Sequence, residues 1–297
     1  MNPRERGFLL LTSRLGNPDR RVLTAQQLRV LAQRVQGRTI SGPDRDLAEA
    51  DLVALGYGRD QAGRIVAMLE EEALLDRYLQ RGKQAGCVPL SRVSAGYPAA
   101  LRKRLGGEAP GCLWARGDLS LLDTPAIALV GSRDLGAQNR DFALAVGMQA
   151  ARQRLTLVSG NARGADRTAQ ESCLAAGGRV ISIVADELDK QPLEKNQLFL
   201  SEDGFHESFS AQRALSRNRI IHALGRMVFV AQATLEKGGT WDGTVKNLRF
   251  GWSPVACFDD GSEAAARLTQ MGAFLVEPEV LKDLEGLAQP EKNFFDP

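Results

Sequence analysis

Short apolar runs alternate with helically spaced apolar residues through the second half of the chain. The runs that predict buried strands are 127–130, 156–159, 180–184, 227–231, 255–258 and 273–276. Helical spacing is found between them, in 139–152, 165–176, 217–224 and 240–250. This alternation predicts a parallel sheet with right-handed crossovers and helices on both faces, which is an α/β fold.

The first 80 residues are different, because their apolar residues recur at helical spacing without strand-like runs. One predicted helix carries Leu28, Leu31 and Val35 and ends near Gly37. We therefore expect a small helical domain at 1–80. Two interpretations of it are open: a module that touches nucleic-acid backbones, or a packing appendage with an arginine-rich face. The connecting region 82–123 holds two further strand-like segments, 87–90 and 113–116.

Polar, glycine-rich junctions follow the predicted strands. In a parallel sheet the carboxyl ends of the strands gather at one edge, where ligands bind. Glycines allow close backbone approach, helix N-termini favour anions, and arginine offers a forked donor for phosphate. Asp166 has a second interpretation, as a helix cap. The residues we expect to form a shared phosphate pocket are Gly131, Ser132, Arg133, Gly160, Arg163, Gly164, Asp166, Arg217, Asn218, Arg219, Gly238, Gly239 and Thr240.

Composition and charge narrow the chemistry. The net charge of the 297 residues is only +2, but nine arginines lie within residues 1–45, and a second group surrounds Arg217. Such local patches suit nucleic acid even in a balanced chain. Only two histidines are present, and neither has metal-ligand spacing. Because no Walker lysine motif or nucleophile elbow occurs either, we expect binding without catalysis, and neither a metal nor a cofactor.

The remaining bulk features concern the compartment. The four cysteines are scattered without paired spacing, which favours reduced thiols over zinc or disulfides. No apolar segment approaches the roughly 18 residues that a membrane span requires. We therefore expect a cytoplasmic protein that does not contact a membrane.

Several motifs, in this order, closely resemble the DNA-processing protein A (DprA/Smf) family. The resemblance covers roughly residues 45–258. The matching segments are Tyr97-Pro98-x-x-Leu101, Leu113-Trp114-Ala115-Arg116-Gly117-Asp118-Leu119, Ala128-Leu129-Val130-Gly131-Ser132-Arg133, Val158-Ser159-Gly160-x-Ala162-Arg163-Gly164-x-Asp166, Asn196-Gln197-x-Phe199 and Ser216-Arg217-Asn218-Arg219-Ile220-Ile221.

The resemblance implies an extended Rossmann-like domain at 81–285, with a tail at 286–297. We expect a departure from many members in that their C-terminal winged helix has no room after Pro254. It implies a homodimer that binds single-stranded DNA, protects it and loads a RecA-type recombinase during DNA uptake by natural transformation, or during recombination. Lys195 would contact the DNA backbone, or Phe199 would stack a base.

Some residues depart from the family pattern. Asn161 and Gln170 stand where leucine and histidine are usual, and the turn Gly238-Gly239-Thr240 replaces a Ser-Gly-Ser type. Together with Asp242, this turn resembles relatives that cleave nucleoside monophosphates. A nucleotide sensor or a nucleoside-monophosphate phosphoribohydrolase is therefore the alternative function, and a protein-interaction scaffold with a vestigial pocket is a third.

Overall fold

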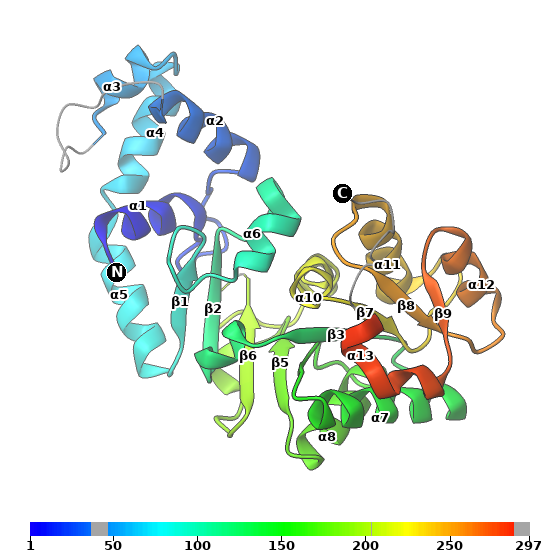
Figure 1. Cartoon of the computed structure of the whole chain (residues 1–297). Coiled ribbons are helices and arrows are strands. Elements are labelled where there is room, and N and C mark those ends of the chain that lie inside the picture. The colour runs from blue at the N-terminus through cyan, green and yellow to red at the C-terminus, as the bar shows by residue number, and fades with distance from the viewer. Residues whose placement is uncertain (37–46, 203, 288–297) are drawn as a thin grey trace, which may run out of the picture.

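The computed structural model describes residues 1–36, 47–202 and 204–287 (Figure 1). The chain begins with a group of helices at one end of the molecule, drawn in blue and cyan in Figure 1. These helices are α1 (Pro3–Thr12), α2 (Ala25–Gln36), α3 (Glu49–Ala54), α4 (Arg59–Leu69) and α5 (Glu72–Gln84). The helical part therefore runs four residues beyond the expected boundary at residue 80, to Gln84.

A nine-stranded sheet forms the rest of the molecule, in the order β1-β2-β6-β5-β4-β3-β7-β8-β9. Its strands are β1 (Val88–Ser91), β2 (Cys112–Gly117), β3 (Ala126–Val130), β4 (Thr156–Ser159), β5 (Arg179–Ile183), β6 (Gln197–Ser201), β7 (Val228–Val230), β8 (Val255–Phe258) and β9 (Phe274–Val276). The seven strands from β6 to β9 along this order run parallel, whereas β1 and β2 add an antiparallel edge.

Helices cover both faces of the parallel strands, so strands such as β3 are buried along their whole length. One face packs against α6 (Ala99–Leu105), α10 (Asn218–Leu224), α11 (Gly238–Phe250) and α12 (Glu263–Gln270). The other face packs against α7 (Ala137–Arg152), α8 (Ala165–Ala175) and α13 (Leu284–Leu287). The short elements η1 (Gly106–Glu108), η2 (Leu119–Asp123), η3 (Leu188–Lys190), α9 (Ala211–Ser216) and η4 (Pro278–Asp283) lie in the connections.

Aromatic side chains join the N-terminal helices to the sheet. Tyr78 of α5 stacks on Phe205, with 4.7 Å between ring centroids, and Phe205 also meets Trp114 of β2 at 4.8 Å. These rings belong to a core that includes Leu9 and Leu75 of the helices. The helices therefore cover the β2–β6 part of the sheet, and a separate small core holds α2, α3 and α4 to one another.

The expected α/β architecture is confirmed, with a Rossmann-like sheet and helices on both faces. The predicted strands at 156–159 and 255–258 have the expected bounds, and the others differ by one residue at one or both ends. Strand β6 was not predicted. Of the tail at 286–297, residues 288–297 lie outside the described residues. No helix in the described ranges is long and apolar enough to cross a membrane.

Candidate functional site

The predicted glycine-rich junctions meet at the carboxyl edge of the central strands. β3, β4 and β7 are neighbours in the parallel part of the sheet, so the loops that leave them lie side by side. With the amino end of α10 they surround a cavity of about 440 Å³, which we call the first cavity. The predicted residues that line it are Gly131, Ser132, Arg133, Asp166, Arg217, Asn218, Gly238, Gly239 and Thr240.

A second cavity, of about 350 Å³, adjoins the first. Arg133, Ala162 and Arg217 line both of them. The residues that line the second cavity alone are Gly160, Asn161, Arg163, Ala185, Asp186 and Phe209. The two cavities are therefore neighbouring compartments of one basic site, with shared arginines at their boundary.

Arg217 is the buried cation of this site, and only 7% of its surface is exposed. Its Nη1 donates to the carbonyl of Ile183 at 2.6 Å, whereas its Nε has no hydrogen-bond partner among the described residues. Burial lowers the pKa of Arg217, against the opposing effect of Asp166. The guanidinium still keeps its charge at neutral pH, because arginine is effectively always protonated in proteins. An anion in either cavity would meet a cation that water barely screens.

Asp166 sits beside this cation and fixes the loop that follows β4. Its Oδ2 accepts a hydrogen bond from the backbone N–H of Ala162 at 3.2 Å. Burial raises the pKa of the Asp166 carboxyl, and the charge of Arg217 acts in the opposite direction. Gly164 is the N-cap residue of α8, so Asp166 braces the preceding loop from inside the helix. Asp166 is therefore not the N-cap residue of α8; it lies inside the helix and holds the loop that precedes it.

Three glycines are required by close approach. A Cβ at Gly160 would overlap the guanidinium of Arg217, and a Cβ at Gly131 would overlap the side chain of Ala165. Gly164 has a φ of +87°, and a Cβ there would overlap the carbonyl oxygens of the Ser132–Arg133 turn. The turns after β3 and β4 therefore touch through their backbones.

Exposed cations stand at the mouth of the site. Arg133 and Lys237 are exposed and line the first cavity. Arg163 lines the second and donates from Nη2 to Asp134 Oδ1 at 2.8 Å, where both side chains are largely exposed. Such an exposed pair contributes little stability, so Arg163 is readily available to an anionic ligand.

The turn at the start of α11 forms the far wall of the first cavity. Gly238 has a φ of +81°, and the side-chain amide of Asn218 donates to the carbonyl of Gly239 at 3.0 Å. The predicted residues Asn218, Gly238, Gly239 and Thr240 are thus brought together. Asn218 also ties α10 to α11, which positions the backbone of the turn.

Arg219 is a correction to the predicted site, because it lies outside both cavities. Its Nη1 donates to Glu202 Oε2 at 2.9 Å, and its Nε donates to the carbonyl of Glu108 at 3.2 Å. Arg217 and Arg219 are two residues apart, and on a helix residues at that spacing do not share a face. Arg219 is therefore committed to a carboxylate of its own chain.

Lys195 and Phe199 are the other corrections. Phe199 lies in the middle of β6, 3% exposed, within the core under the N-terminal helices, so it cannot stack a base. Lys195 is exposed but precedes β6, which runs parallel to β5. It therefore lies at the amino edge of the strands, opposite the two cavities.

Asp242, the residue on which the hydrolase alternative rests, also lies outside both cavities. Asp242 forms an ion pair with Lys246 one turn along α11, at 2.8 Å, and does not line either cavity. His222 does line the first cavity but is fully buried. Burial lowers its pKa to about 3, so the imidazole is neutral at physiological pH.

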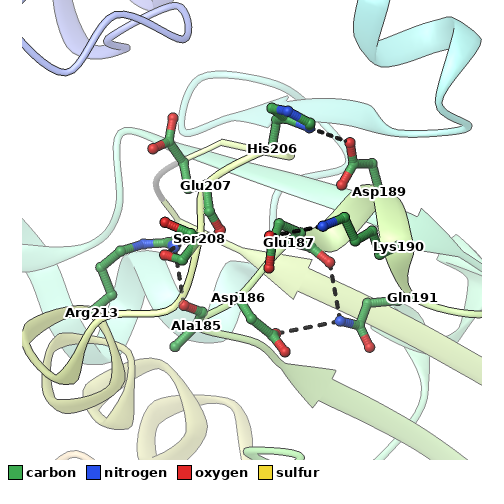
Figure 2. Close-up of polar contacts among 10 residues, drawn as sticks. All are labelled: Ala185, Asp186, Glu187, Asp189, Lys190, Gln191, His206, Glu207, Ser208 and Arg213. Atoms are coloured by element: carbon green, nitrogen blue, oxygen red, sulfur yellow. Dashed lines mark hydrogen bonds and ion pairs between the residues drawn. The ribbon is translucent and has the colours of Figure 1, made fainter.

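Sequence reasoning missed several side chains that line the cavities, among them Lys237, Phe209 and Leu215. Lys237 directly precedes the predicted turn at Gly238, so that motif could have indicated Lys237 as a site residue. Phe209 and Leu215 are respectively 55% and 48% exposed, although each is apolar. Their positions depend on where the loop after β6 returns to the sheet (Figure 2), and β6 itself is not predicted by the pattern of the sequence.

The domain that holds both cavities is similar to known proteins. The family model for DNA recombination-mediator protein A matches residues 90–284, about two thirds of the chain. The chain belongs to this family. The match starts later and extends further than the motifs indicated, which had suggested 45–258. It includes both cavities and every strand from β2 to β9.

The recombination-mediator family match is supported by individual relatives. The DNA processing protein DprA of Streptococcus pneumoniae is 32% identical over 182 residues, which cover 57% of this chain and 64% of that protein. A solved structure of DprA from Streptococcus pneumoniae aligns with a TM-score of 0.70 and 28% identity, over 93% of this chain and 95% of that one. DprA from Helicobacter pylori aligns with a TM-score of 0.56 and 23% identity, over 66% and 94%, and shows the shared fold.

Proposed function

We propose that this protein binds single-stranded DNA in the two cavities at the carboxyl edge of its sheet, without catalysing a reaction. It would act in the cytoplasm during recombination or DNA uptake, where it protects the strand and passes it to a RecA-type recombinase. The observation that carries the proposal is the convergence of Arg133, Arg163, Arg217 and Lys237 with glycine turns around two adjoining cavities.

The character of these cations supports a phosphate backbone as the ligand. Arg217 is a buried, preorganised charge, whereas Arg133, Arg163 and Lys237 are exposed at the entrances. Backbone N–H groups at the start of α11, where Gly238, Gly239 and Thr240 line the first cavity, add donors that suit phosphate oxygens. The relative from Helicobacter pylori is described as having a unique single-stranded DNA binding mode, which supports carrying the ligand class to this chain.

A nucleotide is the second candidate ligand, because the first cavity, at about 440 Å³, lies in the size range of small-molecule sites. The hydrolase version of this alternative has lost its support, since Asp242 pairs with Lys246 away from the cavity. Isothermal titration with nucleoside monophosphates and with oligonucleotides separates the two ligands. Tighter binding of the monophosphate than of a short oligonucleotide would favour the sensor.

Replacing Arg133 tests the proposed ligand directly. Arg133→Ala removes a cation that lines both cavities, and we expect single-stranded affinity to fall about tenfold or more, as for a lost charge-assisted contact. The salt dependence should weaken by about 0.7 in its logarithmic slope for one phosphate contact. Fluorescence anisotropy with a labelled oligonucleotide at several salt concentrations measures both quantities.

The matched control is Arg152→Ala, which removes an exposed arginine in the last turn of α7. Because α7 starts after β3 and runs back across the sheet, Arg152 lies away from the cavities. Equal affinities for the two variants would refute the assignment of the site. In a strand-exchange assay with a RecA-type recombinase, only the Arg133 variant should fail to stimulate exchange; equal stimulation would remove the loading role.

We also propose a homodimer, formed at the free edge of the sheet. Among the described residues β9 pairs only with β8, and its Phe274 and Leu275 are 58% and 43% exposed. An edge strand with exposed apolar side chains is a ready partner for a second copy. This edge is far along the sheet from the N-terminal helices (Figure 1).

A further inference from the structure

A third cavity, of about 370 Å³, lies at the amino edge of the central strands. It is lined by Ala126 at the start of β3 and by Arg226, two residues before β7, whereas Val130 at the end of β3 lines the first cavity. Residues of α6 and η2 form its walls. The third cavity is therefore at the opposite edge of the sheet from the proposed DNA site.

Cations outnumber anions around the third cavity. The charged residues that line it are Arg102, Arg104, Asp123 and Arg226. Arg102 is committed to its own chain, because its guanidinium donates to three backbone carbonyls, those of Arg92, Ser94 and Tyr97. An anionic ligand of this cavity would therefore interact chiefly with Arg104 and Arg226.

Arg104 is a half-buried cation with unused donors. Its Nη1 donates to the carbonyls of Ala223 at 2.8 Å and Gly225 at 2.5 Å, at the end of α10. Within the described ranges its Nε and Nη2 make no hydrogen bond, and no carboxylate forms an ion pair with it. Burial lowers the pKa of Arg104, and the charge of Arg226 acts in the same direction. An anion that contacts both guanidiniums would relieve this repulsion.

The inner wall of the third cavity is apolar, with the buried side chains of Tyr97, Leu121, Val158 and Ile181. An inorganic anion gains nothing from such a wall, since only apolar surface is stabilised by leaving water. The flat base of a nucleoside phosphate can cover the wall while its phosphate meets the arginines. Asp123 adds an acceptor for an amino group of the base, which a fatty acid would not use. The volume is within the range of small-molecule sites.

We propose that the third cavity binds a nucleoside monophosphate, with the phosphate at Arg104 and Arg226 and the base against the apolar wall. This site is separate from the proposed DNA site, because no residue that lines the third cavity lines either of the other two. It is also separate from the nucleotide alternative for the first cavity. The inference therefore does not rest on the proposed function.

Isothermal titration of the full chain with adenosine monophosphate tests the site. Arg226→Ala removes a cation of the cavity, and Ala99→Glu adds a carboxylate to its wall at the first position of α6, where an acidic residue favours the helix. Each variant should weaken binding about tenfold or more, as for one lost charge-assisted contact. The matched control is Lys103→Ala, an exposed cation of α6 outside the cavity, which should bind like the wild type.

Two further probes identify the parts of the ligand that are recognised. Adenosine lacks the phosphate, and inorganic phosphate lacks the base, so each should bind about tenfold or more weakly than the monophosphate. Equal affinity for inorganic phosphate would mean that the cavity binds an anion alone, and equal affinity for adenosine would mean that the arginines are not used. Either result would overturn the proposal.

The location of the bound nucleotide separates this inference from the proposed function. If Arg133→Ala abolishes binding of the monophosphate while Arg226→Ala and Ala99→Glu retain it, the nucleotide occupies the first cavity and the present proposal is wrong. A wild type that binds no monophosphate also contradicts it, and leaves the binding of single strands untouched. Comparison of monophosphate with oligonucleotide in the Arg226→Ala background then tests the first cavity alone.

Discussion

The guanidinium of Arg217 occupies space that any side chain at position 160 would fill. The arginine reaches the carbonyl of Ile183 only by passing over Gly160, where any Cβ would overlap the guanidinium. Its remaining Nε is left for a ligand, since no described residue accepts from it. This close contact with Arg217 explains why position 160, directly after β4, is a glycine although its φ is not positive.

His222 predicts a pH dependence of stability. Its pKa is lowered to about 3 by burial, from an ordinary 6.5, so below pH 6.5 the unfolded chain binds a proton that the folded chain does not. Stability is therefore lost as the pH falls from 6.5 toward 3. Between pH 7.5 and pH 5 this residue should cost roughly 2 kcal/mol. We expect His222→Leu to lose that much less in urea unfolding over this interval. Identical losses would show that the native imidazole is protonated or reached by water.

At the level of elements, the loops after β3 and β4 form one structure. The backbone N–H of Ala165 donates to the carbonyl of Ser132 at 3.1 Å, and Gly164 lies against the same turn. The phosphate-binding surface is thus composed of two crossovers, each of which fixes the other. A substitution at their contact should affect both.

Gly164→Ala should destabilise the protein more than Gly177→Ala. Both glycines have positive φ, at +87° and +76°, so alanine costs about 1–2 kcal/mol of backbone strain at either position. Only at Gly164 would the new Cβ also overlap the Ser132 and Arg133 carbonyls, whereas nothing lies within 4 Å at Gly177. Urea unfolding of the two variants measures the difference. Equal losses would mean that the two loops are free to separate.

The same elements show what sequence reasoning can and cannot predict. β3, β4 and β8 were predicted because their residues are buried without interruption and read as apolar runs. β6 begins with Gln197 and ends with Ser201, both buried, so its pattern does not resemble a run. The resemblance implies a ligand contact for Phe199, whereas tertiary packing under the N-terminal helices decides its position.

For the whole molecule, the edge of the sheet predicts the oligomeric state. Phe274→Lys places a charge on the exposed edge strand β9, where it would be desolvated between two copies. We expect light scattering to give the mass of two chains for the wild type and of one chain for this variant. Val53→Lys, an exposed position on α3, is the control and should remain dimeric. A dimeric Phe274→Lys would place the interface elsewhere.

The segment from Phe205 to Phe209 has a consequence for motion. Phe205 is buried between Tyr78 of the N-terminal helices and Trp114 of the sheet, while Phe209 stands at the second cavity. Separation of α5 from the sheet would remove the packing of Phe205 and loosen the loop that presents Phe209. In hydrogen exchange, amides of this loop should therefore open together with those of α5, as one cooperative unit. A partner that binds the N-terminal helices would then change the affinity of the protein for its ligand.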